Sequence, residues 1–428
     1  MPSKFYLETY GCSLNMADSD LIVGRLHHIG LERADSISGS DFIILNSCGV
    51  KEPTEDRIIH RLEELSANSR PVIVAGCLPR ISLDRLITAI PGYAAILGPQ
   101  SLDSLGPVVE RVLSGERGIL NLDSDEGSKL SYYEGPSDSV ICTIPICEGC
   151  VGECAYCAVK FARSNVRSYS IEEIRRIVER CIHLGYKEIR LTAQDAGAFG
   201  HDTGESLTTL LEQVKLIEGT HRFRLGMFNP NLVLNELAAL IDIMSSERFF
   251  QFFHVPLQSG SNNILDSMQR RYTVEQWIDV VRDIRKHIPD ATIATDIIVG
   301  YPGETEDDFE KTLEVLKEVH PSVINVSKYG DRPGTLASKA NNKVNTDIKK
   351  NRSRRLSQLA NDIITSENQK WIGWQGPVII TGLASRKGLQ GRTPTYKSVI
   401  IEGSSAIGSI VQMRVTGAYR THLTGVIL

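Results

Sequence analysis

Short apolar runs alternate with longer amphipathic stretches through the first 130 residues. Three of the runs read as buried strands, and patterns of helical period lie between them. Strands that alternate with helices imply a parallel sheet with helices on its faces, so we predict an N-terminal α/β domain over residues 1–130. The predicted strands are 4–9, 41–46 and 71–75, the predicted helices are 17–28 and 55–65, and a helix with a linker is expected over 98–139.

The same alternation continues from residue 131 to about residue 342, with six further predicted strands. Six strand–helix units are too few to close an eight-stranded barrel, so we expect an open, partial (βα)6 barrel of the TIM type. Its first helix is marked by a capping box at Ser170 and Glu173. The predicted strands are 140–146, 188–192, 221–226, 250–255, 292–298 and 322–327.

The pattern changes after residue 343. A basic amphipathic helix is expected over 347–371, and several short apolar runs with Gly-rich turns follow it. Short strands at this spacing predict a small β-barrel of the oligonucleotide-binding kind. Those strands are 377–381, 397–402, 410–415 and 423–428. The predicted fold class is therefore α/β multidomain, with the second domain over 131–370 and the third over 371–428.

Composition indicates a reducing compartment and no membrane association. No uninterrupted apolar run reaches the roughly 18–20 residues of a membrane-spanning helix. The N-terminus leads directly into a predicted strand, with no signal peptide. The chain has nine cysteines, and an odd number argues against a disulfide scaffold. We therefore expect a cytoplasmic protein.

The net charge of −5 is distributed unevenly. Residues 343–428 hold thirteen Lys and Arg but only four Asp and Glu, so this segment carries +9 and the remainder −14. A basic tail on an acidic body suggests an anionic partner, and a solvated basic surface is the alternative. Within the tail, Arg392, Tyr396 and Lys397 place cations beside an aromatic ring, which suits phosphate binding and base stacking. These three residues are the predicted RNA contacts.

Three cysteines follow the apolar run 140–146 at the spacing C-x3-C-x2-C: Cys150, Cys154 and Cys157. Iron–sulfur cubes are usually held by four cysteines, so a loop with three ligands leaves one iron open to a small molecule. A zinc loop or a set of buried thiols is the alternative. Structural zinc sites usually pair two C-x2-C knuckles, and no second knuckle follows here. We therefore predict a [4Fe–4S] cluster on this loop.

Three other cysteines each lie just after a predicted strand of the first domain and next to a glycine. In an open α/β sheet the carboxyl ends of the strands line the edge where ligands bind. We therefore expect Cys12, Cys48 and Cys77 to meet at one edge and to hold a second cluster, although three core thiols are the alternative. We interpret Cys142 and Cys181 as core residues and do not expect Cys147 to be a ligand.

The C-x3-C-x2-C spacing, with an aromatic residue before the last cysteine, resembles the radical S-adenosylmethionine (SAM) superfamily. The resemblance implies that the open iron binds SAM, that Tyr156 lies near the adenine, and that reductive cleavage of SAM gives a hydrogen-abstracting radical. Polar side chains that follow the barrel strands are candidates to contact SAM or substrate, or else to cap helices. These candidates are Gln194, Asp195, His254 and Gln258. Further candidates to bind carboxylate or phosphate, or else solvated surface residues, are Arg163, Arg167, Arg270 and Arg271.

Over nearly its full length the chain resembles the radical SAM methylthiotransferases. Segments 10–15, 46–55, 75–77, 254–261 and 296–304 stand in the family's order, and the C-terminal segment looks like a TRAM domain. The resemblance implies two [4Fe–4S] clusters and SAM. One SAM would methylate a sulfur at the Cys12, Cys48 and Cys77 cluster. A second SAM, at the Cys150 cluster, would give the radical that removes the substrate hydrogen before the methylthio group is attached.

The surroundings of residues 15–18 and 49–55 look most like the archaeal and eukaryotic branch of that family. That branch modifies carbon 2 of N6-threonylcarbamoyladenosine next to the anticodon, which implies a tRNA substrate and an electron donor of unknown identity. One alternative substrate is another modified adenosine or a ribosomal-protein side chain. A non-catalytic, RNA-binding iron–sulfur redox sensor is an alternative of another class. We expect a monomer without the hydrophobic C-terminal anchor of some eukaryotic relatives. Ser47 and Ala193 depart from the wider family's common Thr and Gly.

Overall fold

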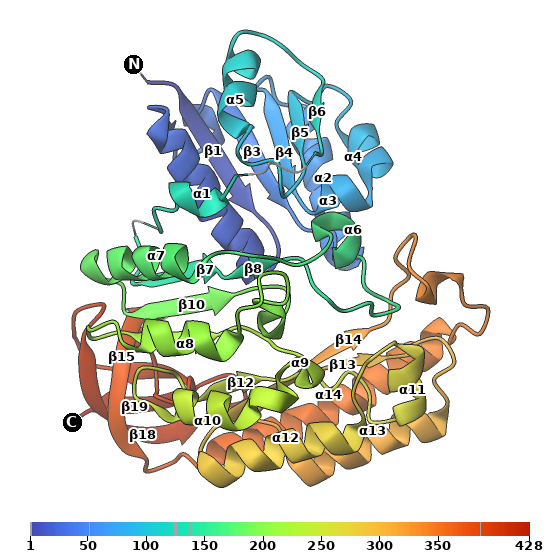
Figure 1. Ribbon diagram of the computed structural model, residues 1–428, viewed down its shortest axis with the longest axis vertical. Coiled ribbons are helices and arrows are strands. Elements are labelled where there is room, and N and C mark those ends of the chain that lie inside the picture. The colour runs from blue at the N-terminus through green and yellow to red at the C-terminus, as the bar shows by residue number, and fades with distance from the viewer. Residues whose placement is uncertain (1, 51, 124–126, 137, 386) are drawn as a thin grey trace.

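The computed structural model describes residues 2–50, 52–123, 127–136, 138–385 and 387–428 (Figure 1). Within these residues the chain forms a six-stranded parallel sheet, an open barrel of parallel strands, and a closed five-stranded barrel, in that order. The predicted fold class is therefore confirmed. No helix among the described residues is both long enough and apolar enough to cross a bilayer.

The N-terminal sheet has helices on both faces. Its strands are β1 (Lys4–Thr9), β2 (Glu32–Arg33), β3 (Phe42–Ser47), β4 (Val72–Gly76), β5 (Ala95–Leu97) and β6 (Ile119–Asn121). Its helices are α1 (Ser13–His28), α2 (Glu52–Ser66), α3 (Leu78–Ile81), α4 (Leu83–Ala89) and α5 (Leu105–Leu113). The strand order is β2-β1-β3-β4-β5-β6, and all neighbours are parallel.

Burial on both faces explains the unbroken apolar run of β3. Phe42 packs in the core shared with α1 and α5, whereas the next residue, Ile43, packs in the core shared with α2 and α4. A strand covered on both faces reads as continuously apolar instead of alternating. The three predicted strands are confirmed. The short strands β2, β5 and β6 were not predicted.

Six parallel strands form the open barrel, as predicted. They are β7 (Ile141–Pro145), β10 (Glu188–Thr192), β11 (Arg222–Leu225), β12 (Phe252–His254), β13 (Thr292–Val299) and β14 (Val323–Lys328). Two groups of three strands are joined by a parallel bridge between Phe223 and Phe249, so the strands follow one another in chain order. A two-stranded ribbon of β8 (Cys147–Glu148) and β9 (Arg167–Ser168) flanks the cysteine loop.

Helices connect successive barrel strands, and a last helix, α14 (Thr346–Gln369), leads from β14 to the C-terminal barrel. The connecting helices are α6 (Val159–Arg163), α7 (Ile171–His183), α8 (Leu207–Lys215), α9 (Pro230–Val233), α10 (Leu237–Ser245), α11 (Asn262–Ser267), α12 (Val274–His287) and α13 (Glu306–Val319). The predicted capping box forms at the start of α7, where the Glu173 amide donates to Ser170 Oγ at 3.2 Å. The predicted basic helix is confirmed as α14. Helix α1 packs against β7, the first edge strand of the barrel (Figure 1).

The C-terminal barrel packs against the amino-terminal end of strand β12 in the open barrel. Its strands are β15 (Gln375–Leu383), β16 (Leu389–Arg392), β17 (Ser398–Glu402), β18 (Ile410–Ala418) and β19 (Leu423–Ile427). They close in the order β15-β16-β17-β19-β18 around a small apolar core. The four predicted strands are confirmed, and β16 was not predicted. The Gln251 amide donates to the Pro394 carbonyl at 2.9 Å, which joins this barrel to the amino-terminal end of β12.

Candidate active site

The loop with Cys150, Cys154 and Cys157 lies between β8 and α6 at the carboxyl end of β7, where barrel enzymes place their catalytic groups. All three thiols are free and partly exposed. The Gly152 amide donates to Cys150 Sγ at 3.2 Å. A Cβ added at Gly152 would stand 3.3 Å from Cys150 Sγ and 3.8 Å from Cys154 Sγ. The glycine therefore keeps the space between these two thiols open.

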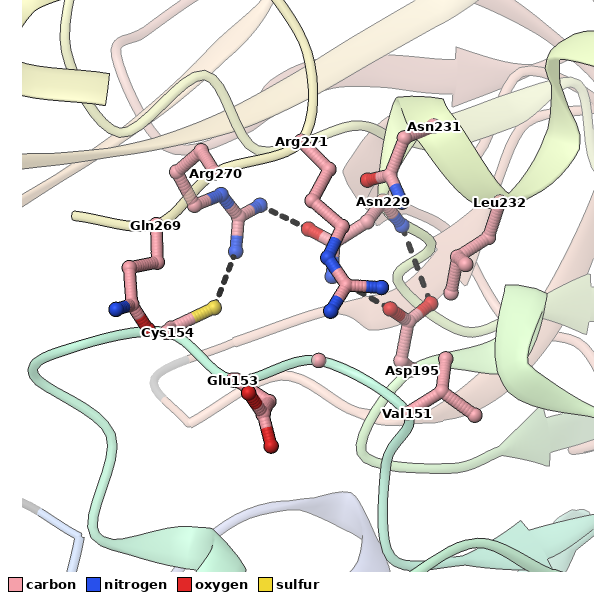
Figure 2. Close-up of a pocket in the computed structure, with 11 residues that line it drawn as sticks. Val151, Glu153, Cys154, Asp195, Asn229, Asn231, Leu232, Gln269, Arg270 and Arg271 are labelled. Carbon is pink, nitrogen blue, oxygen red and sulfur yellow. Dashed lines mark hydrogen bonds between the residues drawn. The ribbon is translucent and has the colours of Figure 1, made fainter. Parts of the chain in front are cut away.

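A chain of hydrogen bonds connects this loop to the barrel (Figure 2). Arg270 Nη1 donates to Cys154 Sγ at 3.1 Å, and its Nη2 donates to Asn229 Oδ1. The Asn229 side-chain amide in turn donates to Asp195 Oδ2. Asp195 Oδ1 also accepts from the backbone amides of Asn229 and Gly197, at 3.1 Å each. Burial raises the pKa of Asp195, and the donors from Asn229 oppose that rise.

These residues line a pocket with groups of both charges. The cysteine loop contributes one wall, Asp195 and Asn229 contribute another, and Arg270 and Arg271 a third (Figure 2). A carboxylate beside two guanidinium groups can bind a molecule that carries both an ammonium and a carboxylate group. The pocket therefore has the charges that the amino-acid portion of SAM requires.

The other predicted SAM contacts lie around the same end of the barrel. Tyr156 meets Tyr301 edge-on, with ring centroids 6.4 Å apart. The side-chain oxygens of Gln194 and Gln258 are buried without a hydrogen-bond partner among the described residues. Both oxygens are therefore free to accept from a ligand. His254 differs, because its Nε2 pairs with Asp296 Oδ2 at 2.8 Å.

Sequence reasoning placed Asn229 and Asp296 among the polar clusters at the ends of barrel strands but gave neither an individual role, and it missed Asn325. Asn229 lies between Arg270 and Asp195 in the chain of hydrogen bonds, and Asn325 Nδ2 donates to Asp296 Oδ1 at 2.9 Å. Asn229 and Asp296 could have been proposed as site residues, because they lie in polar clusters that follow or end a strand. The partners that define their roles lie on other strands and are visible only in the fold.

The structure brings Cys12, Cys48 and Cys77 to one edge of the N-terminal sheet. They follow β1, β3 and β4, which are adjacent parallel strands that end in register. Asn15 Oδ1 lies 3.9 Å from Cys12 Sγ and 3.7 Å from Cys77 Sγ, so two of the thiols share one acceptor. Cys48 takes no part in this shared contact and packs in the apolar core on the α2 and α4 face of the sheet.

Glycines and burial shape this second cysteine set. Gly11 has a φ of +124°, and a Cβ there would stand 2.8 Å from the Cβ of Cys48, so only glycine allows this approach. Burial raises the pKa of Cys77 to about 11, and the charge and hydrogen bond of Arg163 oppose the rise. Burial likewise raises the pKa of Cys48. Metal binding requires the thiolate form, so these two thiols would ionise only if a metal or cation nearby offset the cost of burial.

Among the described residues, no three His, Cys, Asp or Glu side chains converge on one metal-ion position. A [4Fe–4S] cluster does not need such convergence, because each cysteine binds a different iron of the cluster. The three remaining cysteines lie in buried positions, as interpreted. Cys142 and Cys181 lie in the largest core, and Cys147 Sγ donates to the Asp195 carbonyl at 3.8 Å.

The predicted RNA contacts at residues 392–397 are occupied within the chain. The Tyr396 ring packs on Phe250 and Phe252, at 4.9 Å and 5.0 Å between centroids, and its hydroxyl bonds Glu188. Lys397 is buried, and its Nζ donates to Asn368 Oδ1 at 2.9 Å. The Arg392 guanidinium lies 4.6 Å from the centroid of the Tyr396 ring. Tyr396 joins the two barrels and Lys397 bonds α14, so the pairing of cation and aromatic ring did not mark a free surface here.

A second pairing of cation and aromatic ring, which sequence reasoning missed, is exposed. Tyr419 is 56% exposed and stacks on His422 at 5.0 Å, with the exposed Arg420 between them in sequence. Asn368 Nδ2 donates to the carbonyls of Tyr419 and Arg420, at 2.8 Å and 3.2 Å, which fixes this turn to α14. The signal was the run of aromatic and basic residues in the β18–β19 turn.

Three family models match the chain. Residues 4–98 match the uncharacterised protein family UPF0004, residues 144–316 match the radical SAM superfamily, and residues 373–428 match the TRAM domain. The radical SAM match covers the cysteine loop and most of the open barrel. SAM and a [4Fe–4S] cluster are therefore cofactors of this protein. The three free thiols around Gly152, with the Arg270 donor, fit such a cluster.

A "Probable threonylcarbamoyladenosine tRNA methylthiotransferase" of Pyrococcus horikoshii is 39% identical over 99% of both chains. A "tRNA-2-methylthio-N(6)-dimethylallyladenosine synthase" of Pelotomaculum thermopropionicum is 32% identical over 99% of this chain and 97% of its own length. A radical SAM methyltransferase of Kitasatospora setae, TsrM, shares the fold at a TM-score of 0.59 and 12% identity, covering 79% of this chain and 77% of its own. Archaeal relatives named for threonylcarbamoyladenosine are 36–39% identical to this chain, and the chain belongs to the radical SAM methylthiotransferase family.

Proposed function

We propose that this enzyme converts N6-threonylcarbamoyladenosine next to the anticodon of tRNA to its 2-methylthio derivative, using SAM and two [4Fe–4S] clusters. One observation carries the proposal: a single chain holds two separate cysteine triads on adjoining elements. The names of the archaeal relatives supply the nucleoside. The lower identity to a relative named for dimethylallyladenosine supports the threonylcarbamoyl substrate over that alternative.

The barrel residues hold and orient SAM in this proposal. Cys150, Cys154 and Cys157 bind the first cluster, which together with SAM supplies hydrogen-abstraction chemistry when both are bound. Asp195 and Arg270 bind the ammonium and carboxylate groups of SAM, and Asn229 between them fixes both side chains. The buried and unpartnered oxygens of Gln194 and Gln258 accept hydrogen bonds from SAM or substrate. Tyr156 packs near the adenine.

The N-terminal residues hold the second cluster. Cys12, Cys48 and Cys77 provide three thiolates and leave the fourth position of that cluster open to sulfur chemistry. Gly11 permits the close approach of the loops that carry Cys12 and Cys48. The residues present therefore fit a cube with three protein ligands. An external electron donor and a monomeric enzyme are part of the same proposal.

The basic C-terminal segment binds the tRNA. The exposed side chains of Tyr419 and Arg420 provide stacking and phosphate contacts, and the exposed Arg414 lies on the neighbouring strand β18. Arg392, Tyr396 and Lys397, whose side chains contact other parts of this chain, are not included among these contacts. Because the contacts are to phosphates and unstacked bases, binding should weaken steeply as the salt concentration rises.

Single-cysteine variants test the assignment of roles. After anaerobic reconstitution, Cys154→Ala should abolish formation of 5′-deoxyadenosine from SAM. Cys48→Ala should retain it but make no methylthio nucleoside. Cys147→Ser is the matched control, because Cys147 is a neighbouring buried thiol outside both triads, and it should retain both activities. Methylthiolated product from Cys48→Ala would refute the second cluster.

The substrate is tested with purified tRNA that does or does not carry threonylcarbamoyladenosine, and mass spectrometry of the digested nucleosides is the readout. Product only from the modified tRNA supports the proposal. Product on dimethylallyladenosine, or on a ribosomal protein supplied instead, would favour the corresponding alternative. A redox sensor would form no 5′-deoxyadenosine with any of these partners.

A further inference from the structure

A buried arginine of the barrel domain reaches the second cysteine triad. Arg163 is the last residue of α6, the short helix that follows the cysteine loop, and its side chain is 0% exposed. Helix α6 packs against α3, which begins directly after Cys77 (Figure 1). Arg163 Nε donates to Cys77 Sγ at 3.4 Å. One side chain therefore joins the segment that carries the first triad to a ligand of the second.

The guanidinium is held from several sides. Its Nη2 donates to Asn15 Oδ1 at 3.3 Å and to Asp18 Oδ2. Asn15 Oδ1 is the same oxygen that Cys12 Sγ and Cys77 Sγ both approach. The guanidinium is therefore fixed to the centre of the second triad and cannot turn away without breaking these bonds.

The charge of Arg163 is balanced by a small buried network. Arg163 Nη1 lies 3.6 Å from Glu148 Oε2, and Lys129 Nζ donates to both oxygens of Glu148, at 2.7 Å and 2.9 Å. Two cations thus face two carboxylates, Asp18 and Glu148, which lowers the cost of burying the arginine. Within this network Arg163 is the group that contacts a thiol, that of Cys77, whereas Lys129 contacts Glu148.

One donor of Arg163 is not fully satisfied. Its Nη1 makes no hydrogen bond to the described residues and has only the 3.6 Å ion-pair contact with Glu148 Oε2, although the side chain is completely buried. A buried donor without an acceptor is costly, so such a group indicates a partner that the protein alone does not supply. A thiolate-ligated cluster beside Cys77 offers sulfur acceptors with negative charge.

We propose that Arg163 is a positioning residue for the second cluster: it donates hydrogen bonds to Cys77 and to the cluster, and its positive charge raises the cluster's reduction potential. This inference rests on the proposed function, which includes that cluster. Hydrogen bonds to sulfur and local charge are among the main determinants of iron–sulfur potentials. Because Arg163 belongs to the barrel domain, the potential then depends on docking of that domain against the N-terminal sheet.

A full-length variant in which Cys150, Cys154 and Cys157 are all alanine isolates the second cluster. In this parent, Arg163→Gln removes the charge, Arg163→Lys keeps it with fewer donors, and Lys160→Gln removes an exposed charge from the same helix. Reduction is followed anaerobically against mediators by electron paramagnetic resonance, and iron is counted for each variant. Arg163→Gln should shift the reduction equilibrium at least tenfold toward the oxidised cluster, which is 59 mV for one electron. Arg163→Lys should shift it less, and Lys160→Gln should leave it unchanged.

Each possible result either supports or overturns the role of Arg163. An unchanged midpoint reduction potential in Arg163→Gln, with full iron content, overturns the inference. Should Arg163→Gln lose its iron, retention of iron by Arg163→Lys supports the role of the charge, whereas loss from both overturns it. A parent that binds no iron refutes the second cluster itself, and therefore the proposed function. An unchanged far-ultraviolet circular dichroism spectrum shows that a variant has folded.

Discussion

Glu55→Gln should weaken the contact between the N-terminal sheet and the open barrel. Glu55 is 1% exposed on α2, and its Oε2 accepts from Arg332 Nη2 at 2.5 Å. Arg332 follows β14 and is 7% exposed, and it also donates to the carbonyl of Gly49, next to Cys48. The substitution keeps the volume of the side chain but leaves the buried guanidinium without its countercharge.

The size of the effect follows from the burial of both partners. Removing one member of a buried ion pair costs about 3–5 kcal/mol. Glutamine keeps an acceptor oxygen and Arg332 keeps the Gly49 carbonyl, so we expect about 3 kcal/mol, the lower end of that range. Arg85, which is 50% exposed, pairs with Glu55 Oε1 at 2.6 Å and with Asp56, which is 58% exposed, at 2.9 Å. Asp56→Asn is therefore the control, because it disturbs the same exposed Arg85 but leaves the buried pair of Glu55 and Arg332 intact. An exposed pair of this kind contributes at most about 1 kcal/mol.

Hydrogen exchange of the α2 amides, residues 52–66, measures the effect locally. A local measurement is needed because a protein with several domains does not unfold in one step. A loss of about 3 kcal/mol corresponds to exchange that is faster by roughly 100-fold. Exchange rates for Glu55→Gln and Asp56→Asn that agree within about threefold, less than 1 kcal/mol, would refute the reasoning.

Three further predictions concern the first cluster, pH and tRNA. Gly152→Ala should lower the iron bound by the first triad, because its Cβ would stand 3.3 Å from Cys150 Sγ, whereas Gly92→Ala meets nothing within 4 Å and should bind iron normally. Burial lowers the pKa of His221 to about 4, so stability should fall by up to about 3 kcal/mol as the pH drops from about 6.5, the pKa of an unfolded histidine, to 4. The unfolding temperature of His221→Phe should fall less between pH 6.5 and 4 than that of the unchanged protein. An equal fall in both proteins would show that His221 is not the group responsible. Replacing Tyr419 and Arg420 by alanine should weaken tRNA binding and reduce its salt dependence; unchanged binding in a filter assay would show that the tRNA binds elsewhere.

The main strands could be predicted because burial on both faces leaves a continuous apolar run, as in β3. The strands β2, β5 and β6 are two or three residues long, too short for a pattern to show. Strand β16 was not predicted for another reason, which is that it contains a glycine, Gly391. No side chain fits at this position, because a Cβ would stand 2.6 Å from Val378 Cγ1 of the neighbouring strand. That constraint exists only in the paired barrel.

The convergence of Cys12, Cys48 and Cys77 on one sheet edge could be predicted because each follows a strand end, and topology alone brings strand ends together. Long polar side chains could not be assigned in the same way. Tyr396 and Arg163 were both weighed as ligand-binding residues. Their partners, Glu188 and Phe250 for the first and Asp18 and Cys77 for the second, lie far away in the sequence. Because such side chains are long and flexible, the groups that they contact are set by the three-dimensional fold and cannot be found from neighbours in the sequence.

The contacts of the N-terminal sheet explain why an open barrel suffices here. An open barrel has two edge strands, β7 and β14, and the N-terminal part of the chain contacts the protein at both. Helix α1 packs against β7, and Arg332, which follows β14, pairs with Glu55 of α2. Breaking the buried Arg332–Glu55 pair would leave a charge without its partner, so this contact favours the docked arrangement of the two parts. The sheet edge that carries Cys12, Cys48 and Cys77 is therefore held close to the barrel that carries Cys150, Cys154 and Cys157, as the proposed chemistry with two clusters and one nucleoside would require.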